Sequence, residues 1–238
     1  MKKRLMAAVL STAMAATMLL TGSISVQAAD AAAANDPAVE LIFTSVSVSG
    51  DSHTEAMYEF ADKVEELSGG SVTCKCYDNG SLFSSENEFD ALLNGDADLA
   101  YISFPTIATQ IPSYSMFASG YLFSSYEHMT SVLNGDIGLN KIRPQIEETL
   151  NIKPLSSFYL GSRVINTREK EINCYDDMNG LLLRMPNSEA WLFLGEALGA
   201  NPTPLSFSEL YTALQTGAVD AQDNPLPSLS LIHISEPT

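Results

Sequence analysis

Basic residues and cysteines are scarce in this chain. Its 238 residues include 12 lysines and arginines against 29 aspartates and glutamates, so the formal net charge is −17 at pH 7. A surface this acidic repels nucleic acid and anionic membranes, and we expect neither as a partner. The three cysteines cannot all pair, and they form no CxxC pattern or metal-type spacing with histidine. We therefore expect free thiols, with no metal and no cofactor.

Sequence motifs of secreted enzymes are also missing. The chain has no Gly-x-Ser-x-Gly elbow and no His-Glu-x-x-His helix. Its histidines are His53, His128 and His233, and none stands in a recognisable catalytic pattern. The sequence thus predicts no catalytic residue, and we expect a binding protein and not an enzyme.

The first 28 residues have the pattern of a secretory signal peptide. Lys2, Lys3 and Arg4 form a basic start, residues 5–20 are apolar, and Val-Gln-Ala ends at Ala28. We expect cleavage near Ala28, export to the periplasm and no membrane insertion afterwards. The mature chain would carry nine basic side chains against the 29 acidic ones. An anion site must then depend on local cations, and the four remaining arginines are Arg143, Arg163, Arg168 and Arg184.

Hydrophobic periodicity predicts alternating strands and helices in the first half of the mature chain. We expect strands at 40–48, 71–77 and 98–103, a helix over 52–67, and a second helix that a capping box at Ser85–Glu88 opens and that runs to about Asn94. Strand-helix alternation is typical of a parallel sheet with helices on its faces. Helices at 125–133 and 136–150 and a strand at 152–160 follow.

The composition changes around residues 161–162, where we place a boundary between two α/β lobes. An N-terminal lobe would comprise residues 29–160 and a partial second lobe residues 161–238. In the second lobe we expect strands at 163–166, 181–183 and 219–221, a helix over 188–198, and a helix that a second capping box, Ser206–Glu209, opens and that ends at Thr216.

Arg184 stands out among the four arginines. The apolar run Leu181–Leu183 predicts a short strand buried on both faces, with Arg184 at its carboxyl end and Pro186 stopping it. Ligands bind at the carboxyl ends of strands in open α/β sheets, and a guanidinium there can grip a carboxylate or phosphate with two hydrogen bonds. Position alone leaves a second interpretation open, in which Arg184 closes an ion pair at a domain edge.

Two stretches carry a family resemblance. They are Asp-Met-Asn-Gly-Leu-Leu-Leu-Arg-Met-Pro-Asn at 177–187 and Phe-Ser-Glu-Leu-Tyr-Thr-Ala-Leu-Gln-Thr-Gly-Ala-Val-Asp-Ala-Gln-Asp-Asn-Pro-Leu at 207–226. With Leu-Gly-Ala-Asn-Pro-Thr-Pro-Leu at 198–205 and Asn-Gly-Asp-Ala-Asp at 94–98, they resemble the solute-binding proteins of tripartite ATP-independent periplasmic (TRAP) transporters, the DctP family. The resemblance covers nearly the whole mature chain to Leu226.

The resemblance implies a two-lobed periplasmic binding protein fold of the type II kind. The lobes would close on a small organic acid and deliver it to a TRAP membrane permease. Because the first lobe offers no charged contact where relatives can carry one, sialic acid-like recognition is not supported, and a keto acid, a hydroxy acid or a dicarboxylate such as a C4-dicarboxylate fits. A monomer is expected. A ligand-binding sensor subunit that signals to a membrane receptor is the alternative, because it would use the same cleft.

The resemblance also implies the binding residues. The arginine of the family's Leu-Arg-x-Pro motif, which forms a bidentate salt bridge with the ligand carboxylate, matches Arg184. The arginine of its Arg-x-Ile-Asn segment matches Arg163. Asn187, Phe207 and Asn224 match further residues of the pocket. In the first lobe, Ser103 and Thr106 stand where relatives can carry a charge, and Ser47 and His53 are weaker candidates. His53 can equally be a capping or surface histidine.

The C-terminus departs from the family pattern. Relatives continue for some 70 residues beyond the position of Leu226, whereas residues 231–238 here resemble translated sequencing-adapter read-through. We therefore expect a C-terminally truncated fragment with an incomplete second lobe.

Overall fold

The computed structural model describes residues 38–231, so the predicted signal peptide and all but Leu231 of the predicted tail lie outside the described residues. The elements in chain order are β1 (Val39–Thr44), α1 (Ser52–Ser68), β2 (Val72–Tyr77), α2 (Glu88–Asn94), β3 (Leu99–Ala100), α3 (Phe104–Ile107), a 3-10 helix (Pro112–Ala118), α4 (Tyr126–Leu133), a π-helical turn (Gly138–Ile142), α5 (Arg143–Leu150), β4 (Arg163–Thr167), a 3-10 turn (Tyr175–Met178), β5 (Leu182–Met185), α6 (Glu189–Ala197), β6 (Asn201–Pro204), α7 (Leu210–Thr216), β7 (Ala221–Pro225) and α8 (Leu226–Leu231).

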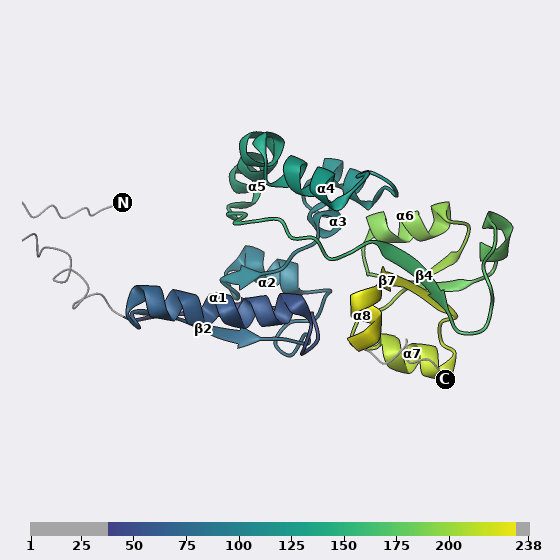
Figure 1. The fold of residues 1–238 in the computed structure, drawn as a ribbon, viewed down its shortest axis with the longest axis horizontal. Coiled ribbons are helices and arrows are strands. Elements are labelled where there is room, and N and C mark those ends of the chain that lie inside the picture. Colours follow the sequence, from purple (N-terminus) through teal and green to yellow (C-terminus); the bar gives the residue numbers. More distant parts are fainter. Residues whose placement is uncertain (1–37, 232–238) are drawn as a thin grey trace, which may run out of the picture. The chain divides into compact units, whose positions relative to one another are not determined.

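The first sheet contains three parallel strands in the order β2-β1-β3. Helix α1 runs alongside β2 (Figure 1) and buries Met57 completely. The helix begins where the Asp51 carboxylate accepts a hydrogen bond from the His53 backbone N–H at 2.8 Å. It ends at Gly69, whose left-handed φ of 62° suits glycine. The predicted parallel βαβ unit is therefore confirmed.

The second sheet has the strand order β4-β7-β5-β6. Strand β7 pairs antiparallel with β4 and parallel with β5, and β5 pairs parallel with β6. Helices α6 and α7 lie on opposite faces of this sheet (Figure 1). The α6 face buries Leu183, Met185 and Trp191. The α7 face buries Leu210, Ala213, Leu214 and Val219, and Val48 from the loop after β1 packs against it. Both faces of β5 and β7 are covered, as parallel strands require.

A helical region connects the two sheets. Phe89, Ile107, Ile111, Tyr114 and Ile146 form its core. The chain then passes Gly161, where φ is 132°, and enters β4. A Cβ atom at Gly161 would lie 2.6 Å from Cβ of Pro225, so only glycine allows this approach. The sheets lie on either side of the proposed boundary at residues 160 and 161, and the division into lobes at that point stays a prediction.

Several predicted strands have different lengths in the structure. Strand β1 ends at Thr44 and β3 has two residues, although we expected 40–48 and 98–103. The predicted strand at 152–160 is wrong, because this segment pairs with no strand among the described residues. The Asn134 side chain forms the backbone hydrogen bonds to Ser157 that a neighbouring strand would otherwise form. Its Nδ2 donates to the Ser157 carbonyl at 2.8 Å, and its Oδ1 accepts from the Ser157 N–H at 2.9 Å.

Neither predicted capping box forms. Helix α2 begins at Glu88 after Asn87, and the Ser85 hydroxyl donates to the Glu86 carboxylate instead of opening the helix. Helix α7 begins at Leu210, one residue after the second match, and Ser206 bonds to the side chain of Glu209 and not to its backbone. In both motifs the serine bonds to a nearby glutamate side chain and not to the backbone of the helix. A sequence pattern alone does not show which of these two bonds forms.

The second sheet differs from the prediction at three strands. Strand β5 extends to Met185, and Leu182 is 37% exposed, so the strand is not buried on both faces at that residue. Strand β7 begins at Ala221 and ends at Pro225, beyond the predicted 219–221. We did not predict β6 because it contains Pro202 and Pro204. As the edge strand of the sheet, β6 tolerates residues that cannot donate a backbone hydrogen bond.

Candidate functional site

Arg184 is the third residue of β5 and is 3% exposed. Its neighbours in register are Thr203 on β6 and Gln222 on β7. Leu183 and Met185, on either side of it, are fully buried against α6, so the alternation of the strand directs Arg184 to the α7 face. Because its two chain neighbours are packed in the core, the backbone of Arg184 is fixed in place.

The Arg184 side chain has few contacts that neutralise its charge. Its Nε donates to the Leu205 carbonyl at 2.8 Å, and its Cζ lies 5.9 Å from the centre of the Phe207 ring. The backbone N–H of Leu205 in turn donates to the Met185 carbonyl at 3.1 Å, which keeps this loop against β5. Within residues 38–231, Arg184 forms no ion pair. The domain-edge ion pair that its position left open is therefore not found among these residues.

Burial is the main influence on the Arg184 guanidinium. Desolvation first and the nearby charge of Arg163 second lower its pKa, Asp223 and Glu86 act in the opposite direction, and the resulting pKa is about 10. A pKa of about 10 keeps the group cationic at neutral pH. The site therefore contains a buried positive charge in a chain whose net charge is strongly negative, and an anion is the natural partner for it.

Arg163, at the start of β4, is paired within the chain. Its Nε donates to Asp223 Oδ2 at 2.8 Å and its Nη2 to Asp223 Oδ1 at 3.0 Å, which makes a bidentate pair. Nη2 also donates to Asn224 Oδ1 at 3.1 Å, and the guanidinium lies 4.7 Å from the centre of the Trp191 ring. Arg163 thus lies close enough to affect Arg184 electrostatically, but its own charge is already compensated.

We predict that Arg163→Ala destabilises the protein by about 3 kcal/mol, because the Asp223 carboxylate is left buried without its partner. The Asp223 side chain is 5% exposed. Urea unfolding of Arg163→Ala, Asp223→Ala and the double variant measures the effect. The double variant should lose clearly less stability than the two single losses added together. Strictly additive losses would show that the pair contributes no coupling.

The other three predicted residues lie around the two arginines in different ways. Asn224, on β7, is buried, and its Nδ2 donates to Gln222 Oε1 at 2.6 Å. Phe207 is half-buried beside Arg184. Asn187 follows β5 in the turn before α6 and is exposed, without a hydrogen bond from its side chain to the rest of the described chain. The structure thus brings Arg184, Arg163, Asn224 and Phe207 together, while Asn187 lies in the exposed turn that follows β5.

Glu86 is a charged residue near this site that the sequence did not single out. It precedes α2, and its carboxylate raises the pKa of Arg184. Burial opposes its own ionisation, but hydrogen bonds from Ser84, its own backbone and Ser85, together with the charge of Arg184, lower its pKa overall. We had assigned Glu86 to a capping box and expected no charged contact from the first half of the chain. Only the folded chain shows that an acid from residues 38–100 acts on Arg184.

The first-half residues that we had expected at the site are mostly engaged locally. Ser103 and Thr106 hydrogen-bond to each other at 2.8 Å between their hydroxyl oxygens. The Ser47 carbonyl accepts from the Asn79 backbone. His53 Nδ1 lies 3.1 Å from Asp51 Oδ1, and hydrogen bonding to His53 lowers the pKa of Asp51. His53 is therefore neither the N-cap residue nor a fully exposed histidine.

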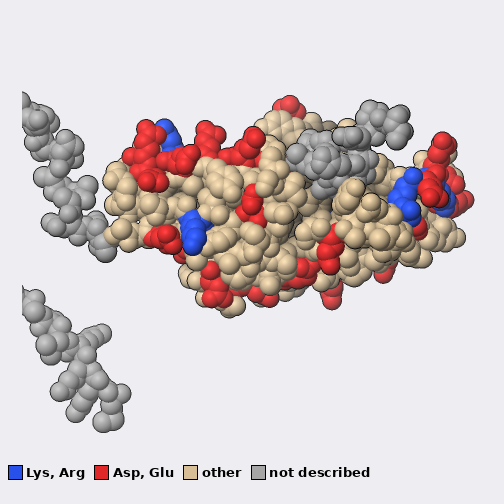
Figure 2. All heavy atoms as spheres, turned by 90° about the horizontal axis from the view of Figure 1, so that it is seen from below, with Lys and Arg blue, Asp and Glu red and all other residues tan. Residues whose placement is uncertain are grey.

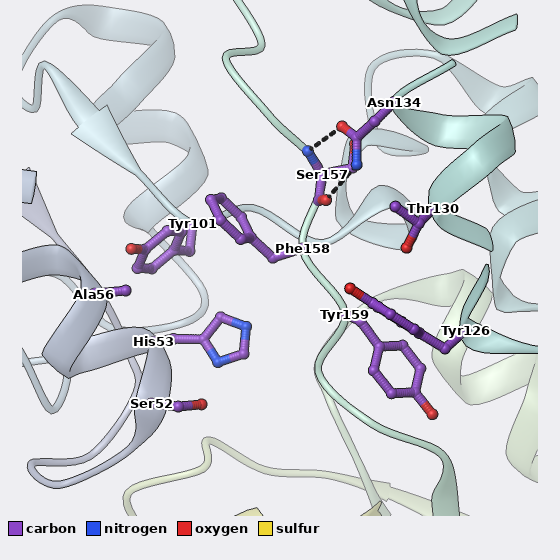
Figure 3. Close-up of a pocket in the computed structure, with 10 residues that line it drawn as sticks. All are labelled: Ser52, His53, Ala56, Tyr101, Tyr126, Thr130, Asn134, Ser157, Phe158 and Tyr159. Carbon is purple, nitrogen blue, oxygen red and sulfur yellow. Dashed lines mark hydrogen bonds between the residues drawn. The ribbon is translucent and has the colours of Figure 1, made fainter.

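His53 lines a pocket of about 420 Å³, together with Ser52, Ala56, Tyr101, Tyr126, Thr130, Asn134, Ser157, Phe158 and Tyr159. Figure 3 shows the rings of His53, Tyr101 and Phe158 turned toward one another, and their centroids lie 5.9 to 6.3 Å apart. None of the five residues predicted to bind ligand is among its lining residues. This pocket is therefore distinct in composition from the arginine site.

Among the described residues, neither the other charged side chains nor the cysteines form a second candidate binding site. On the face seen in Figure 2, acidic side chains are spread widely and basic ones occur in a few places. Cys74 and Cys76 on β2 are half-buried and Cys174 is exposed; all three are free thiols. In the described part of the chain, no three His, Cys, Asp or Glu side chains are placed to hold a metal ion.

Comparison with known proteins identifies a family. The sequence model of the bacterial extracellular solute-binding protein, family 7 (DctP), matches residues 43–236. The sialic acid-binding periplasmic protein of Vibrio cholerae is 32% identical over 176 residues, which are 74% of this chain and 54% of that protein.

Solved structures agree with this match. A TRAP periplasmic solute-binding protein from Roseobacter denitrificans with bound 3-deoxy-D-manno-oct-2-ulosonic acid is 39% identical with a TM-score of 0.76, over 82% of this chain and 64% of that one. One from Sulfurospirillum deleyianum with bound succinate is 27% identical with a TM-score of 0.73, over 82% and 62%. The chain thus spans roughly half to two thirds of the length of these relatives.

Proposed function

Because this chain belongs to the bacterial extracellular solute-binding proteins of family 7, the DctP family of TRAP transporters, we propose that it captures a small organic acid and delivers it to a TRAP permease. The observation that supports capture of an acid is Arg184. It is a buried cation without an ion-pair partner among the described residues, on a strand packed on both sides.

The proposed mechanism is capture by closure of two lobes. An incoming carboxylate accepts hydrogen bonds from the terminal nitrogens of Arg184, while Nε stays on the Leu205 carbonyl and keeps the guanidinium oriented. Closure removes water from the pair, which strengthens the charge-assisted hydrogen bonds. Asn224, Phe207 and Asn187 would surround the rest of the ligand, and Arg163, paired with Asp223, would hold the Asn224 amide in place at the site.

We propose a hydroxylated acid of the sugar-acid type as ligand in preference to a C4-dicarboxylate. Relatives carry both kinds, since one was solved with an eight-carbon sugar acid and another with succinate. Glu86 favours the first kind here. Its carboxylate acts on Arg184 and would repel a second carboxylate nearby, whereas ligand hydroxyls can donate hydrogen bonds to it.

The proposal includes the cellular setting. Residues 1–28 would be a signal peptide cleaved near Ala28, and the mature protein would act as a monomer in the periplasm. None of the described helices has both the length and the apolar character needed to cross a membrane. Uptake of the acid should be lost when the gene is deleted. Retained uptake, with loss of a transcriptional response to the acid, would instead indicate the sensor function.

A thermal-shift screen tests the capture of an acid. Binding to the native state raises the melting temperature by mass action, and a ligand at 100 times its dissociation constant adds about 2.7 kcal/mol. We expect stabilisation by hydroxylated monocarboxylates such as D-galactonate, less by succinate, and none by the corresponding neutral sugars. A panel in which neutral sugars stabilise as strongly as the acids would contradict the carboxylate site.

A further inference from the structure

Gln222 lies at the centre of the second sheet. Strand β7 is flanked by β4 and β5, and Gln222 is 0% exposed. It is the register partner of Arg184 on the neighbouring parallel strand. Paired residues of adjacent strands direct their side chains to the same face, so Gln222 and Arg184 share the α7 face of the sheet.

Hydrogen bonding determines which way the Gln222 amide points. Arg163 has donors only, so Asn224 must turn its Oδ1 toward Arg163 Nη2, at 3.1 Å. The Nδ2 of Asn224 then faces Gln222, which must present its oxygen, and the two atoms are 2.6 Å apart. The Nε2 amino group of Gln222 is therefore directed away from Asn224. Arg163 thus sets the orientation of the Asn224 amide and, through it, that of the Gln222 amide.

The amino group of Gln222 has no hydrogen-bond acceptor in the described part of the chain, and it is fully buried. A buried donor without an acceptor destabilises a fold. The hydrogen bond from Asn224 accounts for the oxygen of the Gln222 amide, but nothing in the described part of the chain accounts for its buried amino group. The neighbouring Arg184 has donors only, and the Gln222 oxygen is turned to Asn224, so neither side chain supplies an acceptor to the other.

We propose that Gln222 is a further ligand-binding residue, whose Nε2–H donates to an oxygen of the acid that Arg184 binds. This inference rests on the proposed function. Because Nε2 has no contact with solvent, an oxygen reaches it only when neighbouring side chains yield on binding. The donor has then already lost its water, so the hydrogen bond is gained without a further desolvation penalty. Gln222 would favour acids that present a second acceptor oxygen beside the one held by Arg184.

Gln222→Glu tests this donor while it preserves shape and the acceptor for Asn224. At pH 8 a carboxylate at position 222 pairs with Arg184 and competes with the ligand, so we expect the dissociation constant for D-galactonate to rise more than 100-fold. Gln215→Glu, the same change at an exposed position on α7, serves as control and should leave the affinity unchanged.

Calorimetry and melting curves of the same samples separate the possible outcomes. Wild-type affinity of a folded Gln222→Glu at pH 8 overturns the inference. If Gln222→Glu shows no melting transition, Gln222→Met is measured instead. A roughly 10- to 100-fold loss of affinity with intact melting then supports the inference, and an unchanged affinity overturns it. If the wild type itself binds no acid of the panel, the proposed function fails, and that result is distinct from a failure at position 222.

Discussion

Arg184→Ala should reduce affinity for the acid by two to four decades. In the proposed complex the ligand carboxylate and the Arg184 guanidinium are buried together, and removing one partner of such a pair typically costs about 3–5 kcal/mol. The alanine also removes the hydrogen bond to the Leu205 carbonyl and the contact with the Phe207 ring. Isothermal titration calorimetry with the best acid of the screen measures the change. The variant should still fold, because it removes a buried charge that has no ion-pair partner among the described residues.

Two controls make this prediction specific. Arg184→Lys keeps the charge but lacks the planar fork, so it should restore little of the affinity. Arg168→Ala removes the same charge beside Gly217 and Glu169, and should leave affinity within about twofold. Equal losses in Arg168→Ala and Arg184→Ala would point to a general effect of net charge. Near-wild-type binding by Arg184→Ala would falsify the assignment of the carboxylate to this residue.

Glu88→Gln should make the protein more stable at alkaline pH. Glu88, in the first turn of α2, is 3% exposed, and its Oε1 has no hydrogen-bond partner in the part of the chain described. Burial raises its pKa to about 7, and the hydroxyl of Thr44 lowers it only in part. An ordinary glutamate in the unfolded chain has a pKa near 4.5. Between these values the native state holds a proton that the unfolded state has released.

The sign of the pH dependence follows from this difference. Because the native state binds more protons, the contribution of Glu88 to stability falls as the pH rises from about 4.5 to about 7, and it stays low above that. The full difference is about 3 kcal/mol at most. Urea unfolding at pH 4.5, 6 and 8 should show Glu88→Gln nearly equal to the wild type at the lowest pH and more stable at the highest.

Asp90→Asn is the matched control, since Asp90 is an exposed carboxylate in the same helix. Its difference from the wild type should stay within about 0.5 kcal/mol at each pH. The prediction fails if Glu88→Gln is the less stable protein at pH 8. That result would mean that the ionised carboxylate has a partner in solution.

Part of this protein could be predicted because the information is local in the chain. Helix α1 with its glycine end, strand β2 and helix α6 follow from hydrophobic periodicity and glycine position, and the structure contains them within a residue or two of the predicted bounds. The place of Arg184 follows from an apolar run that ends in an arginine and a proline. The family resemblance follows from the same residues, because the motif around Arg184 is continuous in sequence.

Local patterns failed where tertiary contacts decide the outcome. The sequence predicted a strand at residues 152–160, but the Asn134 side chain occupies the backbone hydrogen bonds of Ser157. Strand β6 contains two prolines and forms nonetheless, since an edge strand can lack donors. A strand forms only where a second strand lies beside it, and the tertiary fold decides which segments lie side by side.

The amino-acid sequence by itself determined that the chain alternates strands and helices, that its few cations include an arginine on a buried strand, and that it resembles a family which binds acids. Only the tertiary structure decided how those cations are used. Within residues 38–231, Arg163 is paired with Asp223 and Arg184 forms no ion pair, while Glu86 and Gln222 act on or lie beside Arg184 from distant positions in the sequence. The reason is that charge compensation and desolvation depend on distances in space, which separation along the chain does not specify.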